Sequence, residues 1–158
     1  MKKVAVSLTL LFLVVAASGL MADVAGADDV IVTPSSKIEV IYFASQECPY
    51  CIEWQVYTWR AFKKTAVAQH VAWVVIEKGS LYNKISKRDY PREHQWMFDQ
   101  APTLGNVVPA WWLIVDGKPV HSGVGEHQWL TVIEPTIVRL VGEKLAAGGQ
   151  QKVSEVSR

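Results

Sequence analysis

The chain has two cysteines, Cys48 and Cys51, in the motif Cys48-Pro49-Tyr50-Cys51. Two thiols at this spacing can close a disulfide or exchange one with another molecule, and they are too few for a four-ligand zinc site. A structural disulfide gains little from so short a loop, because its stabilisation grows with the length of chain that it closes. The motif therefore favours redox chemistry.

The motif lies between a predicted strand and a predicted helix. Residues 37–44 are rich in β-branched and aromatic side chains, which predicts a strand. Pro49 suits the first turn of a helix. Apolar residues then recur at steps of three and four, which predicts an amphipathic helix. Its expected buried face holds Ile52, Val56, Trp59, Phe62 and Ala66.

This placement predicts different roles for the two cysteines. A helix N-terminus offers unpaired N–H groups and the positive end of the helix dipole, both of which favour a thiolate. Cys48 is expected to be accessible and acidified, and so to be the nucleophile. Cys51 is expected to be less exposed and to resolve the mixed disulfide. Glu47 is a possible modulator of the Cys48 pKa, since its charge would oppose the thiolate if it pointed inward.

The middle of the chain predicts a second strand and an irregular region. Residues 71–76 form a nearly continuous apolar run, as expected of a strand buried on both faces. Residues 79–106 are harder to interpret, although Pro91 and the apolar residues after it indicate a helix over residues 89–100.

The C-terminal third predicts a hairpin followed by a helix. Residues 107–115 are strand-like, and Asp116-Gly117 is a hairpin turn signal. Residues 119–122 are expected to form a short strand that either lies at an edge of the sheet or starts at Pro119, because a proline cannot donate to a ladder.

Residues 129–145 have helical periodicity, within which Pro135 implies a kink or a late helix start. The order of elements is that of an α/β domain with parallel pairing first and an antiparallel hairpin last. The folded domain is expected to cover residues 37–147, with a flexible lead-in at 28–36 and a polar tail at 148–158.

Residues 1–27 have the anatomy of a secretory signal peptide. Lys2 and Lys3 precede an apolar run, and small residues suited to cleavage follow. The alternative is an uncleaved membrane anchor, since residues 4–22 carry no charge and are just long enough to span a bilayer. Either way, we expect a periplasmic location, where disulfides form and persist.

Composition excludes some classes of function. The 158 residues carry 16 Lys and Arg against 15 Asp and Glu, a net charge of +1. A net charge this close to zero gives no indication of the basic surface that binds nucleic acid. Half of the residues are hydrophobic (50%), which is enough for the core of one domain.

The sequence resembles the thioredoxin superfamily over roughly residues 38–145. The resemblance is carried by Tyr42-Phe43-Ala44, Cys48-Pro49-Tyr50-Cys51, Val107-Val108-Pro109, Asp116-Gly117-Lys118 and Val124-Gly125. Cys-Pro-Tyr-Cys looks like glutaredoxins and one class of periplasmic disulfide isomerase, whereas Val108-Pro109-Ala110 looks like the periplasmic disulfide oxidases. Small periplasmic thioredoxin-like proteins of sulfur-oxidation systems also have a comparable size and motif.

The resemblance implies a thioredoxin-like fold, in which helices flank a central mixed sheet. It also implies a cis peptide bond between Val108 and Pro109 that faces the cysteines. A substrate segment would be bound by Pro49, Tyr50, Val108, Pro109 and Gly125. Many members bury an acidic residue six positions before the first cysteine as a proton relay; this chain has Tyr42 there, so the relay is missing or replaced.

The function predicted from residues and resemblance together is an exported thiol–disulfide oxidoreductase. Its expected partners are client proteins and a membrane or periplasmic redox partner. We expect a monomer that needs no bound cofactor, and the sequence leaves the direction of electron flow open. The alternative is a periplasmic Cu(I) carrier that uses the same cysteines. His94, His121 and His127 are its possible third ligands, although their spacing does not place them near the motif.

Overall fold

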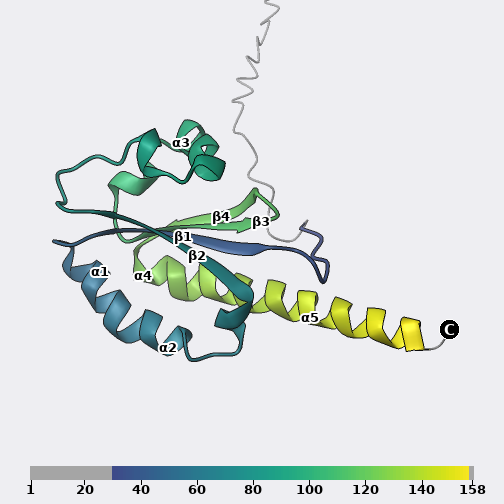
Figure 1. Cartoon of the computed structure of the whole chain (residues 1–158). Coiled ribbons are helices and arrows are strands. Elements are labelled where there is room, and N and C mark those ends of the chain that lie inside the picture. Colours follow the sequence, from purple (N-terminus) through teal and green to yellow (C-terminus); the bar gives the residue numbers. More distant parts are fainter. Residues whose placement is uncertain (1–29, 157–158) are drawn as a thin grey trace, which may run out of the picture.

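A four-stranded mixed sheet forms the centre of the molecule (Figure 1). The computed structural model describes residues 30–156. The strands are β1 (Ile38–Ser45), β2 (Val71–Lys78), β3 (Ala110–Val115) and β4 (Lys118–Val124), and the order in the sheet is β2-β1-β3-β4. β1 pairs in parallel with β2 and antiparallel with β3, and β3 pairs antiparallel with β4. The predicted thioredoxin-like architecture is confirmed.

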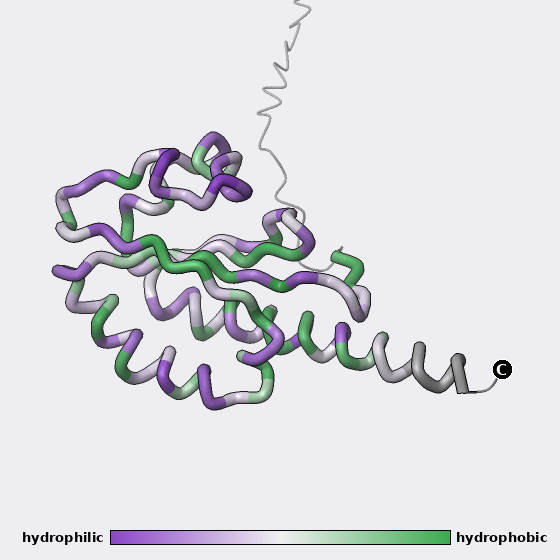
Figure 2. Tube along the Cα trace, viewed as in Figure 1, coloured by the Kyte–Doolittle hydropathy of each residue, from purple (hydrophilic) through white to green (hydrophobic). Residues whose placement is uncertain are grey.

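Side chains alternate along β1 between two buried layers, as the period of a strand requires. Val40 and Tyr42 point to the face that carries the long helices, which we call the helix face. Ile41 and Phe43 point to the opposite face, which is covered by residues 79–106, called the insert. Figure 2 shows apolar residues gathered along the strands between these two coverings.

The helix after the cysteine motif contains a wide turn. It comprises α1 (Pro49–Trp54), a π-helical segment (Gln55–Trp59) and α2 (Arg60–Phe62). The predicted buried face is wrong in part: Phe62 is buried, but Ile52 and Val56 are exposed, and Trp54 is buried in their place. A π-helical turn holds more residues than an α-helical turn, so it keeps Trp54 and Phe62 on one side, which the expected spacing missed.

β2 differs from its prediction as well. It lies at an edge of the sheet, and Val75 is exposed over 59% of its surface. On the helix face, a pocket of about 200 Å³ lies against Val75 and is lined also by Trp59 and Trp73. The apolar run of β2 is therefore not buried on both faces, because an open pocket lies between Val75 and the helix that carries Trp59.

The insert is built mostly of single turns. Three 3₁₀ segments (Lys87–Asp89, Arg92–His94 and Leu104–Asn106) flank the short α3 (Gln95–Gln100). The helix predicted over residues 89–100 is therefore present only in its second half. Its first half is 3₁₀ and extended backbone around Pro91, because the residue before a proline is disfavoured in the α region.

The hairpin between β3 and β4 is confirmed. Asp116 and Gly117 both have positive φ, 49° and 78°, which is the conformation of a two-residue hairpin turn. β4 is an edge strand, which is one of the two alternatives that Pro119 left open, and it starts one residue earlier, at Lys118. Its register with β3 shifts between Leu113 and Ile114.

The C-terminal helix begins earlier and ends later than predicted. α4 (Gly125–Gln128), a π-helical segment (Trp129–Ile133) and α5 (Glu134–Val156) follow one another. Pro135 lies just after the π-helical segment, so the wide turn falls where a proline would disrupt α-helical bonding. The expected polar tail is helical as far as Val156.

The N-terminal boundary also differs from expectation. Val30 and Val32 pack against the helix-face core, and Thr33 N–H donates to Ser36 Oγ at 2.9 Å. Residues 30–36 are thus held by contacts where a flexible lead-in was expected. The predicted signal peptide lies outside the described residues. Within residues 30–156, no helix is both long and apolar enough to cross a membrane.

Candidate active site

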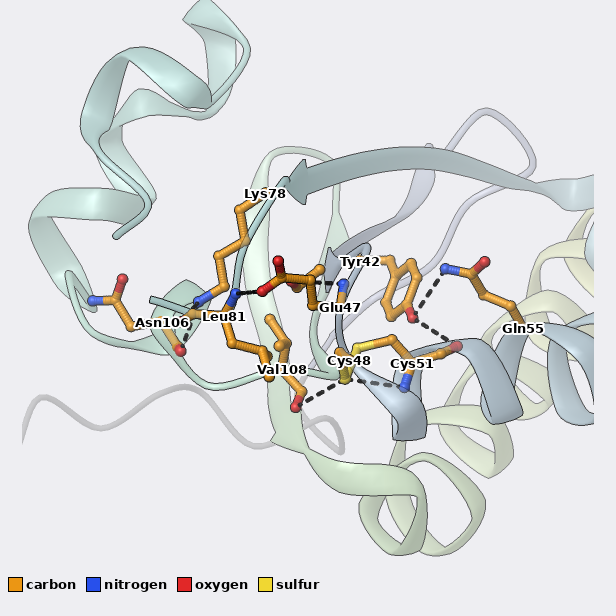
Figure 3. The surroundings of a disulfide bond; sticks show 10 residues. Tyr42, Glu47, Cys48, Cys51, Gln55, Lys78, Leu81, Asn106 and Val108 are labelled. Atoms are coloured by element: carbon orange, nitrogen blue, oxygen red, sulfur yellow. Dashed lines mark hydrogen bonds between the residues drawn. A yellow bond between two sulfur atoms is a disulfide. The ribbon is translucent and has the colours of Figure 1, made fainter. Parts of the chain in front are cut away.

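The cysteine motif lies where β1 gives way to α1. Cys48 is the N-cap of α1, Pro49 occupies the first helical turn, and a disulfide joins Cys48 to Cys51 with their Cα atoms 5.2 Å apart (Figure 3). The helix start that the sequence predicted at Pro49 is therefore present, and it determines where both sulfur atoms lie.

Main-chain groups at the helix start are directed at Cys48. The N–H of Cys51 donates to Cys48 Sγ at 3.1 Å, and the N–H of Ile52 donates to the Cys48 carbonyl oxygen at 3.1 Å. A hydrogen bond to a sulfur atom favours its charged form. After reduction, this geometry would stabilise a thiolate at Cys48.

The expected difference in exposure between the cysteines is absent. Cys48 is 2% exposed and Cys51 is 0% exposed, so the prediction of an accessible Cys48 is wrong for the disulfide form. Cys48 is covered because it packs against the loop before β3, where its Sγ lies 3.7 Å from the carbonyl oxygen of Val108. The distinction between the cysteines therefore rests on their places in the helix.

Three residues expected from the resemblance meet beside the disulfide. The Val108–Pro109 peptide bond is cis. Gly125 has a φ of 80° and donates its N–H to the Pro109 carbonyl oxygen at 2.9 Å. A positive φ favours glycine, and open space lies where its Cβ would be. Pro49 and Tyr50 lie at the exposed surface of the motif.

Tyr42 lies six residues before Cys48, on β1. Its hydroxyl donates to the Cys51 carbonyl oxygen at 3.5 Å and accepts from Gln55 Nε2 at 3.4 Å. Burial raises the pKa of Tyr42 to about 12, against a smaller lowering by the Gln55 hydrogen bond, and the Glu77 charge raises it further. The group next to Cys51 is therefore neutral near pH 7. Gln55 was not predicted, although it lies one helical turn beyond Cys51.

Glu47 turns away from the cysteines. Its Oε2 accepts hydrogen bonds from Ser80 Oγ at 2.7 Å and from the Leu81 N–H at 3.3 Å (Figure 3). The carboxylate thus binds the first residues of the insert. The sequence gave no signal for this contact, because it joins a side chain to main chain far along the chain.

Lys78 is a second charged residue that the sequence did not indicate. Its ammonium donates to the carbonyl oxygens of Leu81 at 3.3 Å and Asn106 at 3.0 Å. The residue is buried at the end of β2, and burial lowers the pKa of Lys78. Lys78 thereby joins the start of the insert to the loop that leads to Val108.

The histidines considered as metal ligands do not join the cysteines. His94 is buried on the insert face, where its Nε2 lies 3.3 Å from Glu39 Oε1. His121 lies on β4 and His127 on α4. Within the part of the chain that the structure describes, no three His, Cys, Asp or Glu side chains gather as a metal site.

The aromatic side chains around the motif form core. Trp54 is buried and its ring centroid lies 4.5 Å from Tyr42, 5.1 Å from Trp111 and 5.0 Å from Trp129. Trp111 and Trp112 are buried on opposite faces of β3. Trp54 thus packs the helix against the sheet.

No protein-family model and no curated protein matches the sequence. Among solved structures, a thioredoxin of Malassezia sympodialis is 13% identical, with 66% of this chain and 78% of that chain covered and a TM-score of 0.44. The periplasmic thioredoxin SoxS of Paracoccus pantotrophus is 13% identical, covering 68% and 98%, with a TM-score of 0.40. The DsbH oxidoreductase is 16% identical, covering 64% and 72%, with a TM-score of 0.40.

The strand order β2-β1-β3-β4 and the cysteine pair at the start of α1 are the arrangement that a thioredoxin-like fold predicts. That fold, with an adjacent cysteine pair, fits thiol–disulfide exchange.

Proposed function

We propose that the protein is an exported thiol–disulfide oxidoreductase that exchanges disulfides with client proteins through Cys48 and Cys51. The observation that carries this proposal is the position of Cys48 at the N-cap of α1, where its Sγ accepts the Cys51 N–H at 3.1 Å. A nucleophilic cysteine needs a stabilised thiolate, and this contact supplies the stabilisation.

In the reducing direction, the thiolate of Cys48 attacks one sulfur of a client disulfide. A Cys48–client disulfide forms, and the other client sulfur leaves as a thiolate that takes up a proton. Cys51 then loses its proton and attacks Cys48 Sγ, which releases the second client sulfur and restores the Cys48–Cys51 disulfide. Two electrons pass to the client. Oxidation of a client follows the same steps in reverse.

The client segment would lie across the loop before β3. Val108 and Pro109 supply main-chain groups to an extended segment, as in strand addition. Gly125 leaves open space for the segment to approach, and Tyr50 and Pro49 border it from the motif. Cys48 is covered in the disulfide form, so the client or the loop must shift for attack to occur.

The proposed location is the periplasm, on the basis of the signal-peptide features of residues 1–27. The protein would act as a monomer without a bound cofactor, and a membrane or periplasmic redox partner would restore its working state. The direction of electron flow depends on the reduction potential of the cysteine pair. The site residues do not determine this potential, because oxidases, isomerases and reductases have them in common.

Equilibration of the cysteine pair in glutathione buffers tests the proposal. A reduction potential of about −120 to −180 mV would make the protein a donor of disulfides, and about −250 mV or lower would make it a reductant. Failure to exchange with glutathione or with any protein disulfide, together with stoichiometric Cu(I) binding, would contradict the proposal and favour the metal carrier.

A further inference from the structure

Both main-chain groups of Leu81 are held by charged side chains close to the disulfide. The Leu81 N–H donates to Glu47 Oε2 at 3.3 Å, and the Leu81 carbonyl oxygen accepts from Lys78 Nζ at 3.3 Å. Ser80 Oγ adds a third bond, to Glu47 Oε2 at 2.7 Å. Hydrogen bonds at both main-chain groups restrain where Leu81 lies relative to Glu47 and Lys78.

The two holding residues place Leu81 between the segments that border Cys48. Glu47 immediately precedes Cys48 in the chain. Lys78 Nζ also binds the carbonyl oxygen of Asn106, two residues before Val108, at 3.0 Å. Figure 3 shows Leu81 between Glu47 and the Val108 loop. The start of the insert is therefore part of the rim of the cysteine site.

Two apolar side chains of this rim are exposed to solvent. Leu81 is 43% exposed and Val107 is 54% exposed. The charges beside them are already engaged, because the Glu47 carboxylate and the Lys78 ammonium bind main-chain groups of the insert. A client segment that approaches Cys48 from the side of the insert would therefore contact the apolar side chains of Leu81 and Val107.

We propose that Leu81 and Val107 form a subsite for a large apolar side chain next to the reacting cysteine of an extended client segment. This inference rests on the proposed function and deepens it, because it assigns a client preference to the insert. Contact with such a side chain removes apolar surface of both partners from water, which favours binding. Glu47 and Lys78 are positioning residues for this subsite, because they act through Leu81.

Two disulfide-containing peptides that differ only in leucine or serine beside the reacting cysteine test the subsite. The probe reaction is reduction of each peptide by the reduced full-length protein, measured as a second-order rate constant. We expect the leucine peptide to react about fivefold faster, the effect of partial burial of one aliphatic side chain. In Leu81→Ser the ratio should fall to about one. Because both peptides are measured on the same variant, a loss of active protein cancels in the ratio.

Two further comparisons separate recognition from general surface and charge effects. Leu145→Ser changes a leucine of similar exposure (52%) on α5 and should keep the fivefold ratio. Glu47→Gln and Glu47→Ala both remove the charge, but only the amide can still accept from Ser80 and Leu81. The ratio should therefore persist in Glu47→Gln and fall in Glu47→Ala.

Equal rates for the two peptides with the unsubstituted protein would overturn the subsite and leave the proposed function intact. A ratio that survives Leu81→Ser would equally overturn the role of Leu81. If the reduced protein reacts with neither peptide nor with a small-molecule disulfide, the proposed function is wrong and the inference falls with it.

Discussion

The two faces of the sheet are built in different ways. The helix face is covered by long helices, and its core is dominated by aromatic rings around Trp54 and Trp129. The insert face is covered by single turns and encloses polar groups, among them Glu39 and His94. Cys51 belongs to the first core, whereas Leu81 and the loop bordering Cys48 are held by polar contacts of the insert. On the proposed function, the regularly packed face supports the cysteine chemistry and the irregular face selects the client.

Substitution of the cysteines should have the largest effect of all on disulfide exchange. Cys48→Ser should lower disulfide exchange at least about a thousandfold, because no other thiol remains in position to form the mixed disulfide. Cys51→Ser should instead accumulate client bound to Cys48, visible on non-reducing gels. Accumulation in Cys48→Ser and not in Cys51→Ser would reverse the proposed roles.

Large-to-small changes on each face should cost similar stability but differ in their redox consequences. Trp54→Ala should lower the free energy of unfolding by about 3–5 kcal/mol and Met97→Ala by about 2–5 kcal/mol, measured in urea. Both side chains are fully buried, one in each core.

Only Trp54→Ala should shift the equilibrium of the cysteine pair with glutathione. Trp54 packs on Tyr42, whose hydroxyl contacts the Cys51 carbonyl oxygen. A comparable shift in Met97→Ala would show that the two faces do not divide the work in this way.

A buried tyrosine on each face allows a comparison by pH. Burial raises the pKa of Tyr42 and of Tyr90 to about 12, from 10.0. The native state favours the neutral phenol, so this contribution to stability is complete below pH 10 and is lost as the pH rises towards 12. Unfolding in urea across this range should lose part of its pH dependence in Tyr42→Phe and in Tyr90→Phe.

At pH 7 the same two variants should differ. The Tyr42 hydroxyl has two partners, so Tyr42→Phe should cost about 1 kcal/mol. The Tyr90 hydroxyl is buried with no hydrogen-bond partner among the described residues, so Tyr90→Phe should be neutral or stabilising. Equal costs at pH 7 would indicate an equivalent environment for the two phenols.

The smallest effect is expected at the buried polar pair of the insert face. Within residues 30–156, neither ring nitrogen of His94 has a hydrogen bond, although Nε2 lies 3.3 Å from Glu39 Oε1. His94→Leu should therefore be neutral or raise the free energy of unfolding by about 1 kcal/mol. Glu39 keeps Lys37 as a partner at 2.8 Å in that variant. Destabilisation by more than about 2 kcal/mol would show that the pair supports the insert.

What the sequence predicts well is local. Pro49 marks the helix start, Asp116-Gly117 marks the hairpin, and Pro119 marks an edge strand, because each restricts the backbone at its own position. The cysteine pair was found in the same way, from spacing and setting.

What the sequence misses depends on contacts between distant segments. The face of α1 was misjudged at Ile52 and Val56, because the π-helical turn after Trp54 changes which residues align. Glu47 contacts Leu81, which is 34 residues further along the chain, so no local sequence pattern predicts the contact. The bond from Lys78 to the Leu81 carbonyl oxygen involves main chain, which the residue types do not indicate. The burial of Cys48 likewise results from the distant Val108 loop.

The two edge strands of the sheet, β2 and β4, differ in how readily they could pair with a strand of another molecule. Pro119 and the register shift in β4 interrupt pairing with an added strand. β2 pairs with β1 in unbroken register. Its residues are apolar from Val71 to Ile76, and the strand ends with the charged Glu77 and Lys78. Of the two edge strands, β2 is therefore the one at which molecules could pair and aggregate. Replacing the exposed Val75 by lysine would place a charge on this edge and should raise the solubility of the protein.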